Sequence, residues 1–173
     1  GTANLNEIVL FQSGLPWHWN AFRSLGGFMS FLTFFLVMLI WQVRPPFDFP
    51  VAMANGINGL TSVYSGFSKS LFSFQKNLSL VVSSAFIVCV YFGGSAVPFD
   101  LTFFGRGASF VEFFYFVTKS IFVMILFIWI RWSLPRLAME QILHFSWKVL
   151  IPLGALSVLV SIIAVALKFT GTT

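Results

Sequence analysis

The sequence predicts an all-α integral membrane protein with about four transmembrane helices and two basic loops. The chain has 173 residues, of which 58% are hydrophobic and only 9% are charged. A soluble domain carries about 25% charged residues. In addition, four long windows contain almost no charge, and each approaches the roughly 20 apolar residues that a helix needs to cross a bilayer. These observations exclude an ordinary soluble enzyme, a disordered tail and a secreted disulfide scaffold.

The windows are continuous apolar runs, which favours helices over alternating barrel strands. The predicted spans are residues 24–43, 77–99, 113–130 and 149–168. The segments around them are an interfacial N-terminal segment (1–23), a loop (44–77), a short opposite-side loop (100–112) and a loop with a short helix (131–148). Within the first segment, Trp17, His18 and Trp19, followed by Arg23, are typical of an interfacial anchor.

The loops of residues 44–77 and 131–148 share one side of the membrane and carry most of the positive charge. The first contains Arg44, Lys69 and Lys76, and the second contains Arg131, Arg136 and Lys148. The positive-inside rule therefore directs both loops to the cytoplasm or the mitochondrial matrix, with both termini on the other side. Because these loops account for most of the net charge of +5, the sequence implies membrane lipid as a partner but not nucleic acid.

The first informative stretch is Arg44-Pro45-Pro46-Phe47-Asp48-Phe49-Pro50, directly after the first predicted span. Its three prolines stop the helix and keep the backbone stiff and extended. One interpretation is a helix-stopping turn with an arginine that reaches the interface. The other is the edge of a ligand chamber, with Arg44 and Asp48 as its polar rim.

The loop of residues 131–148 carries three titratable side chains at helical spacing. Glu140, His144 and Lys148 are four residues apart, so they share one helix face. A solvated stripe on an interfacial helix explains this pattern without any ligand. A metal site would need another nearby His or Cys, so none is predicted.

Lys119 lies within the third predicted span, where an ionisable side chain is costly. It faces either the bundle interior, with a function, or the membrane surface by snorkelling. Cys89 is the single cysteine and lies in the second span, so it cannot form an internal disulfide.

Several short motifs follow one another in order along nearly the whole chain. They are Asn4 to Val9, Arg44 with Pro46-Phe47-Asp48 and Pro50, Gly59, Tyr64-Ser65-Gly66, Val117-Thr118-Lys119, Trp129-Ile130-Arg131, Leu134-Pro135-Arg136, Gln141, Trp147-Lys148 and Pro152. With this order and spacing the chain resembles subunit 1 of respiratory complex I, the proton-translocating NADH:quinone oxidoreductase. The resemblance covers only the C-terminal half of that family's eight-helix protein, which implies a split subunit whose N-terminal half is a separate chain.

The resemblance implies a non-redox subunit that is not catalytic alone and binds no cofactor or metal, with ubiquinone as the substrate of the complex. The implied partners are other complex I subunits, including the N-terminal half and the peripheral subunits of the quinone site. The implied location is the mitochondrial inner membrane or, alternatively, a bacterial plasma membrane. The residues at quinone-chamber positions are Arg44, Pro46, Phe47, Asp48, Arg131, Arg136 and Glu140.

The chain departs from the family at six positions that carry acids in its relatives. These positions are Trp41, Val51, Met53, Asn55, Val63 and Lys76. In the family such acids line a hydrated path thought to carry charge away from the quinone site. A proton relay needs titratable or water-holding groups at hydrogen-bond spacing. The departures therefore predict a subunit that keeps the quinone chamber while its proton relay is lost.

Two alternatives remain at this stage. The chain could be a structural relic that holds the peripheral arm to the membrane without a working quinone site. Independently of the resemblance, it could be an unrelated small transporter, which would purify alone or as a homo-oligomer.

Overall fold

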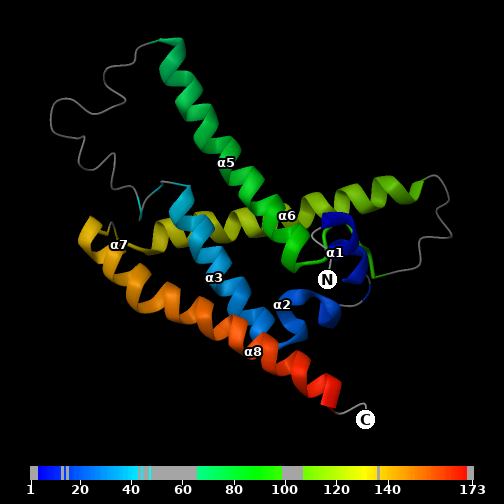
Figure 1. Ribbon diagram of the computed structural model, residues 1–173. Coiled ribbons are helices and arrows are strands. Elements are labelled where there is room, and N and C mark those ends of the chain that lie inside the picture. The colour runs from blue at the N-terminus through cyan, green and yellow to red at the C-terminus, as the bar shows by residue number, and fades with distance from the viewer. Residues whose placement is uncertain are drawn as a thin grey trace.

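The computed structural model describes residues 4–12, 14, 16–42, 44, 47, 66–98, 107–135 and 137–170. In these ranges every regular element is helical, which confirms the all-α class. The elements are α1 (Leu5–Phe11), the 3₁₀ turn η1 (Pro16–His18), α2 (Asn20–Arg23), α3 (Leu25–Trp41), α5 (Phe67–Tyr91), α6 (Ala108–Ser133), α7 (Met139–Phe145), the π-helical turn η3 (Ser146–Leu150) and α8 (Ile151–Thr170). Figure 1 shows their course.

Three helices in the described ranges are long and apolar enough to cross a membrane, and a shorter apolar helix accompanies them. The three are α5, α6 and the stretch Met139–Leu167, while α3 is the shorter one. The helices extend beyond the charge-free windows: α5 begins at Phe67 rather than at residue 77, and α6 runs from Ala108 to Ser133. A charged residue marks where a helix leaves the hydrocarbon, not where its backbone hydrogen bonding ends.

The predicted loop at residues 131–148 is largely helical. Residues 131–133 still belong to α6, and from Met139 the helix continues through η3 into α8 without a break. Pro152 lies one residue after the start of α8, where its ring would clash with the carbonyl four residues earlier and its missing N–H would interrupt the helix. The π-turn before it, in which the N–H of Ile151 donates to Ser146 O, lets the helix pass this proline.

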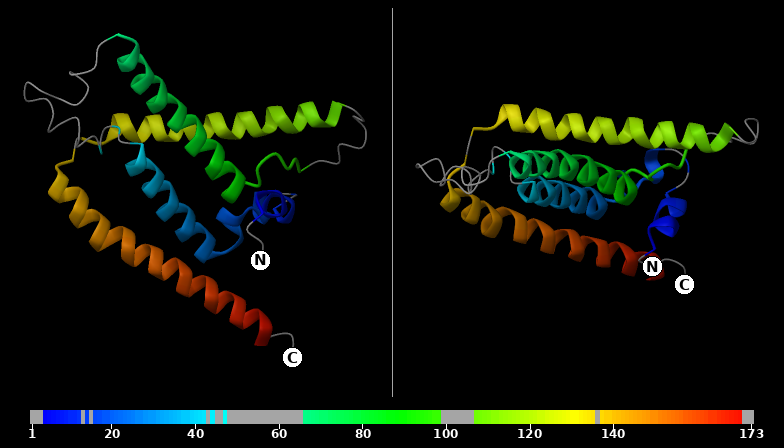
Figure 2. Two further views of the ribbon diagram at one scale, coloured as in Figure 1. Left: turned by 45° about the horizontal axis from the view of Figure 1, so that its top comes forward. Right: turned by 90° about the horizontal axis from the view of Figure 1, so that it is seen from above.

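The helices pack in layers. In Figure 2, α6 and α8 lie on opposite outer sides of the bundle, and α3 and α5 lie between them. The Phe35 and Phe127 rings stack at the centre, with centroids 4.5 Å apart and planes 5° apart. Around them the buried core consists of Leu39, Phe47, Ile87, Val88, Val123 and Ile142.

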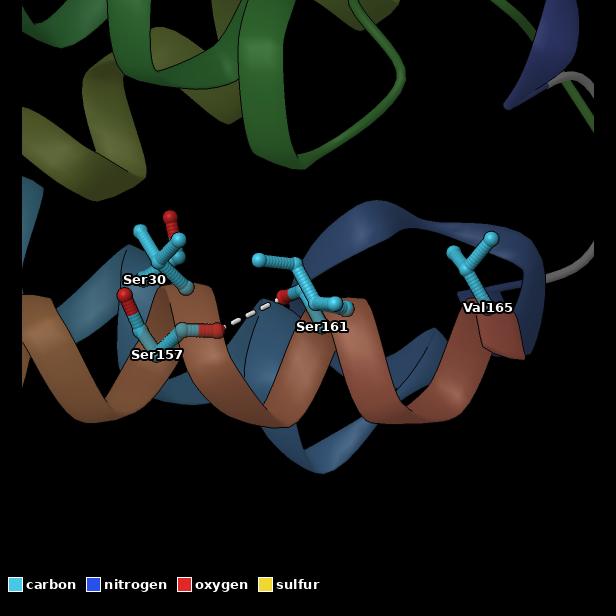
Figure 3. Close-up of a pocket in the computed structure, with 6 residues that line it drawn as sticks. Ser30, Ser157, Ser161 and Val165 are labelled. Atoms are coloured by element: carbon cyan, nitrogen blue, oxygen red, sulfur yellow. Dashed lines mark hydrogen bonds between the residues drawn. The ribbon is translucent and has the colours of Figure 1, made fainter. Parts of the chain in front are cut away.

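Small residues bring α3 and α8 into close contact. A Cβ on Gly26 would lie 2.6 Å from Ser161 Oγ, and a Cβ on Gly154 would lie 3.5 Å from Thr33 Cγ2. Small side chains allow this approach, which is typical of helix contacts in membranes. Beside the contact lies a groove of about 380 Å³ lined by Ser30, Ser157 and Ser161 with three aliphatic residues of α8 (Figure 3). The Ser161 hydroxyl donates to Ser157 O.

The N-terminal segment folds back onto the C-terminal end of α5 and is more than a surface anchor. Gln12 is completely buried; its Nε2 donates to Val90 O, and its Oε1 accepts from Gly93 N. Trp17 is 77% exposed, as an interfacial residue would be. The side chain of Trp19, by contrast, turns inward and meets Phe92 edge to face.

Candidate functional site

The candidate site begins where α3 ends, at the proline-rich element. The Phe47 N–H donates to Arg44 O across 2.8 Å, which closes a turn. The Phe47 side chain is 3% exposed and belongs to the central core. Burying a phenylalanine stabilises the packed arrangement by about 1.5–3 kcal/mol. Phe47 therefore fixes the start of this element against the helix bundle.

Polar side chains from α3, α5 and the element meet beside this turn. Arg44 Nη2 donates to Asn77 Oδ1 at 2.7 Å, and Gln42 Nε2 donates to Ser83 Oγ at 2.9 Å. Gln42 and Ser83 are both buried. We call Gln42, Arg44, Asn77 and Ser83 the polar cluster. It is built from neutral groups around a single cation.

A second arginine approaches from the last turn of α6. Burial lowers the pKa of the Arg44 guanidinium, and the positive charge of Arg131 lowers it further. Arg44 Nε is buried without a hydrogen-bond partner, and within the described part of the chain neither arginine pairs with a carboxylate. Two neighbouring cations with an unused N–H donor attract an electron-rich oxygen atom.

Glu140 is on α7, which contributes Ile142 to the same core. Its own side chain, however, lines a separate groove of about 380 Å³ with His144 and Lys148. The structure thus confirms that the three titratable groups share one helix face. It does not bring Glu140 into the polar cluster.

Lys119 is neither free nor directed to the membrane surface. Its Nζ donates to Phe92 O at 2.8 Å and to Gly94 O at 3.2 Å, carbonyls that follow the end of α5. It also lies 4.1 Å from the centre of the Tyr115 ring and 4.5 Å from that of Trp19. Neither snorkelling nor an open bundle interior, the two alternatives from the sequence, describes this contact: Lys119 caps the end of a transmembrane helix.

Several predicted positions lie outside the described residues. They are Pro46, Asp48 and Arg136 of the chamber set, and Val51, Met53, Asn55 and Val63 of the former acidic positions. Of the remaining two acidic positions, Trp41 ends α3 and is 60% exposed, and Lys76 lies within α5. No group of three or more metal-ligating side chains occurs in the ranges that the structure describes.

Comparison with known proteins identifies the family. The profile of the NADH dehydrogenase family matches residues 1–162. The chain belongs to the NADH dehydrogenase family.

Curated relatives of this NADH dehydrogenase family chain are named as membrane subunits of one type within NADH-quinone oxidoreductase. Those of Anaeromyxobacter dehalogenans and Desulfotalea psychrophila are each 32% identical, over 88% and 93% of the chain. A third relative, from Cytophaga hutchinsonii, is 32% identical over 93% of the chain. The chain spans 40–48% of the length of these three relatives, about half of each.

Sequence reasoning missed the buried members of the polar cluster in this family member. Gln42 and Ser83 are uncharged residues inside predicted spans, 41 positions apart. Asn77 was only a boundary residue. Because buried polar groups in a membrane need partners, the amide at the end of an apolar run was the available signal.

Proposed function

We propose that the chain is a membrane-arm subunit of respiratory complex I and that it forms part of the wall of the quinone chamber. The observation that carries the proposal is the Arg44–Arg131 pair, with its unused Nε–H donor, beside the buried Phe47. The name of the relatives, as components of NADH-quinone oxidoreductase, supports the assignment.

Ubiquinone fits the chemistry of this wall. Its two carbonyl oxygens accept hydrogen bonds from a guanidinium, and they become more electron-rich as the ring is reduced, so the attraction to the arginines increases. This chain supplies orientation and charge for that step. The electrons come from cofactors on other subunits, so the chain is not catalytic alone.

The proposed partners are the other subunits of complex I. They include a separate polypeptide that corresponds to the N-terminal half of the relatives, together with the peripheral subunits that complete the quinone site. Membrane lipid surrounds the remaining surface. The proposed location is the mitochondrial inner membrane, with a bacterial plasma membrane as the alternative.

Native electrophoresis tests complex membership. A band stained for NADH dehydrogenase activity, cut out and analysed for peptides, is expected to contain this chain. Migration alone or as a homo-oligomer would instead favour a small transporter. A complex whose NADH oxidation resists quinone-site inhibitors would favour the structural relic.

Substitution of Arg44 tests the chamber. We expect Arg44→Met to raise the KM for ubiquinone on the order of ten-fold, because a hydrogen bond from a charged group contributes about 1.5–3 kcal/mol. Arg44→Lys keeps the charge but loses the forked donor geometry, so its effect is expected to be smaller. Lys69→Met is the matched control, since Lys69 is an exposed cation on α5. Equal KM values for Arg44→Met and Lys69→Met would refute the role of Arg44.

We further propose that the proton relay through this chain is lost. Trp41 takes the place of a family acid beside the cluster, and the cluster members Gln42, Asn77 and Ser83 cannot change charge at any physiological pH. Proton uptake per NADH oxidised, measured in sealed vesicles, is therefore expected to be unchanged by Asn55→Leu. A normal stoichiometry that falls in this variant would contradict the loss.

A further inference from the structure

A second cavity lies at the other end of α5 from Arg44, where α2, α5 and α6 meet (Figure 1). Its volume is about 380 Å³. Its wall consists mainly of aromatic rings, with a threonine, a lysine and a valine. The residues that the argument uses are Trp19, Phe22, Phe92, Lys119 and Phe122.

The aromatic wall is formed by the fold itself. The Trp19 and Phe92 rings meet edge to face at 5.6 Å, and the Phe22 and Phe92 rings do so at 6.3 Å. Edge-to-face pairs of this kind favour a defined geometry. Lys119 ties Phe92 in place through the carbonyl of that residue. The cavity is therefore preformed rather than a chance gap between mobile side chains.

The cavity opens outward toward the surroundings of the transmembrane helices. Phe22 is 52% exposed and Phe122 is 60% exposed, although both line the cavity. Phe22 lies in α2, directly before the apolar helix α3. Tryptophan next to the start of a transmembrane helix is typical of the level at which lipid headgroups meet the hydrocarbon.

One polar group of the wall lacks a partner. Trp19 Nε1 is buried, and no acceptor for it occurs among the described residues. A buried N–H without an acceptor is rare in folded proteins because its desolvation is not compensated. The three carbonyls beside it, those of Phe92, Gly94 and Ala96, already accept from Lys119.

We propose that this cavity binds one membrane phospholipid. Part of an acyl chain lies along the rings of Phe22, Phe92 and Phe122, and an ester carbonyl of the lipid accepts the hydrogen bond from Trp19 Nε1. A lipid supplies both groups at this depth, because its esters lie where the hydrocarbon begins. The positive charge of Lys119 close to the indole favours the same electron-rich oxygen.

The character of the wall favours lipid over a helix of another polypeptide. Helix contacts in membranes use small residues that let backbones approach, as Gly26 and Ser161 do between α3 and α8. Large rings dominate the wall of this cavity instead. Rings leave a narrow, smooth slot that suits a flexible chain, and this inference does not depend on a working quinone site.

The test measures lipid retention by the protein purified in its native assembly. After repeated detergent exchange, lipids are extracted and counted per chain by mass spectrometry. We expect the wild type to retain one phospholipid that Phe122→Trp loses, because the larger ring fills the slot. Phe113→Trp is the matched control, since Phe113 is on the same helix, is 61% exposed and does not line the cavity. Trp19→Phe removes only the donor and is expected to weaken retention about five-fold, the effect of one hydrogen bond.

Photolabelling locates the lipid without relying on the variants. The assembly is reconstituted in phosphatidylcholine vesicles that contain a phosphatidylcholine with a photoreactive acyl chain, then washed and illuminated. Label on the peptide that contains Trp19 or Phe122, reduced in Phe122→Trp, supports the proposal. Equal retention and equal label in wild type and Phe122→Trp would overturn it, as would a cysteine at position 122 that crosslinks to another polypeptide. Neither readout depends on NADH oxidation, so a failed quinone assignment would not be mistaken for a failed lipid site.

Discussion

At the scale of single residues, Lys119 illustrates how a charge is accommodated inside a membrane protein. The last carbonyls of a helix have no partner within the helix, and they carry the negative end of its dipole. Lys119 reaches from α6 to the carbonyls that follow α5 and places its ammonium group there. The charge and the orphan carbonyls compensate each other, which neither could do alone in hydrocarbon.

Removing this ammonium group should destabilise the end of α5. We expect Lys119→Met to lower the free energy of unfolding by about 1–3 kcal/mol, because the carbonyls of Phe92 and Gly94 lose their donor. Lys148→Met is the control, since Lys148 lies on the exposed face of η3. Thermal unfolding in detergent measures the difference. If both variants melt at the same temperature, Lys119 is not a cap.

Gln12 makes the same point for a neutral side chain. Its two amide ends serve four backbone groups, including Val90 O and Gly93 N in the α5 region. We expect Gln12→Leu to release the N-terminal segment, because the replacement is similar in volume but leaves those groups unpaired. Faster protease cleavage before residue 20, with α3 intact, is the expected readout. Glu7→Leu in α1 is the control and should leave the cleavage rate unchanged.

At the scale of elements, the contact between α3 and α8 depends on which glycine is considered. Both Gly26 and Gly154 lie inside helices, where alanine is favoured over glycine by about 0.8–1 kcal/mol. A new Cβ at Gly154 meets Thr33 at an ordinary contact distance. At Gly26 it would lie 2.6 Å from Ser161 Oγ and 3.1 Å from the Ser161 backbone nitrogen. The same substitution therefore has opposite consequences at the two positions.

We expect Gly154→Ala to leave the protein as stable as the wild type or slightly more stable. Gly26→Ala should separate the two helices and lower the melting temperature, because the backbone of α8 has to move. Thermal unfolding of the two variants side by side is the measurement. A Gly26→Ala protein that melts with the wild type would show that the helices do not approach as closely as described.

At the scale of the whole molecule, the bundle leaves its outer helices largely uncovered. Only 11% of the apolar window of α6 and 6% of that of α8 is buried. Burial within the chain therefore contributes little to holding these two helices in place. Lipid and partner subunits are left to cover the rest, in keeping with a chain that spans about half of its relatives.

This exposure leads to a prediction about assembly. Expressed without its partners, the chain is expected to be degraded several-fold faster than when it is expressed with the other complex I subunits, because α6 and α8 then lack their covering surfaces. Pulse-chase labelling of the chain in cells measures the two half-lives. Equal half-lives would indicate that the fold is self-sufficient.

How far the sequence predicts this molecule depends on the range of the interactions involved. The apolar windows located all four apolar helices, because burial in lipid is decided residue by residue. They misplaced the start of α5 and divided the helix at 139–170 into two parts, because backbone hydrogen bonding continues past a charge and past Pro152. Arg44, Phe47 and Arg131 were found through motifs, whereas Gln42, Asn77 and Ser83 are brought together only by packing between distant segments.

The π-turn at Ser146–Leu150 has a consequence for helical phase. One residue corresponds to about 100° around an α-helix, so the wide turn sets the rotation of α7 relative to α8. Deleting a single residue there would restore an unbroken α-helical repeat and turn Ile142 out of the core and Glu140 toward a new direction. This stretch should therefore be intolerant of changes in length even where it tolerates changes of side chain.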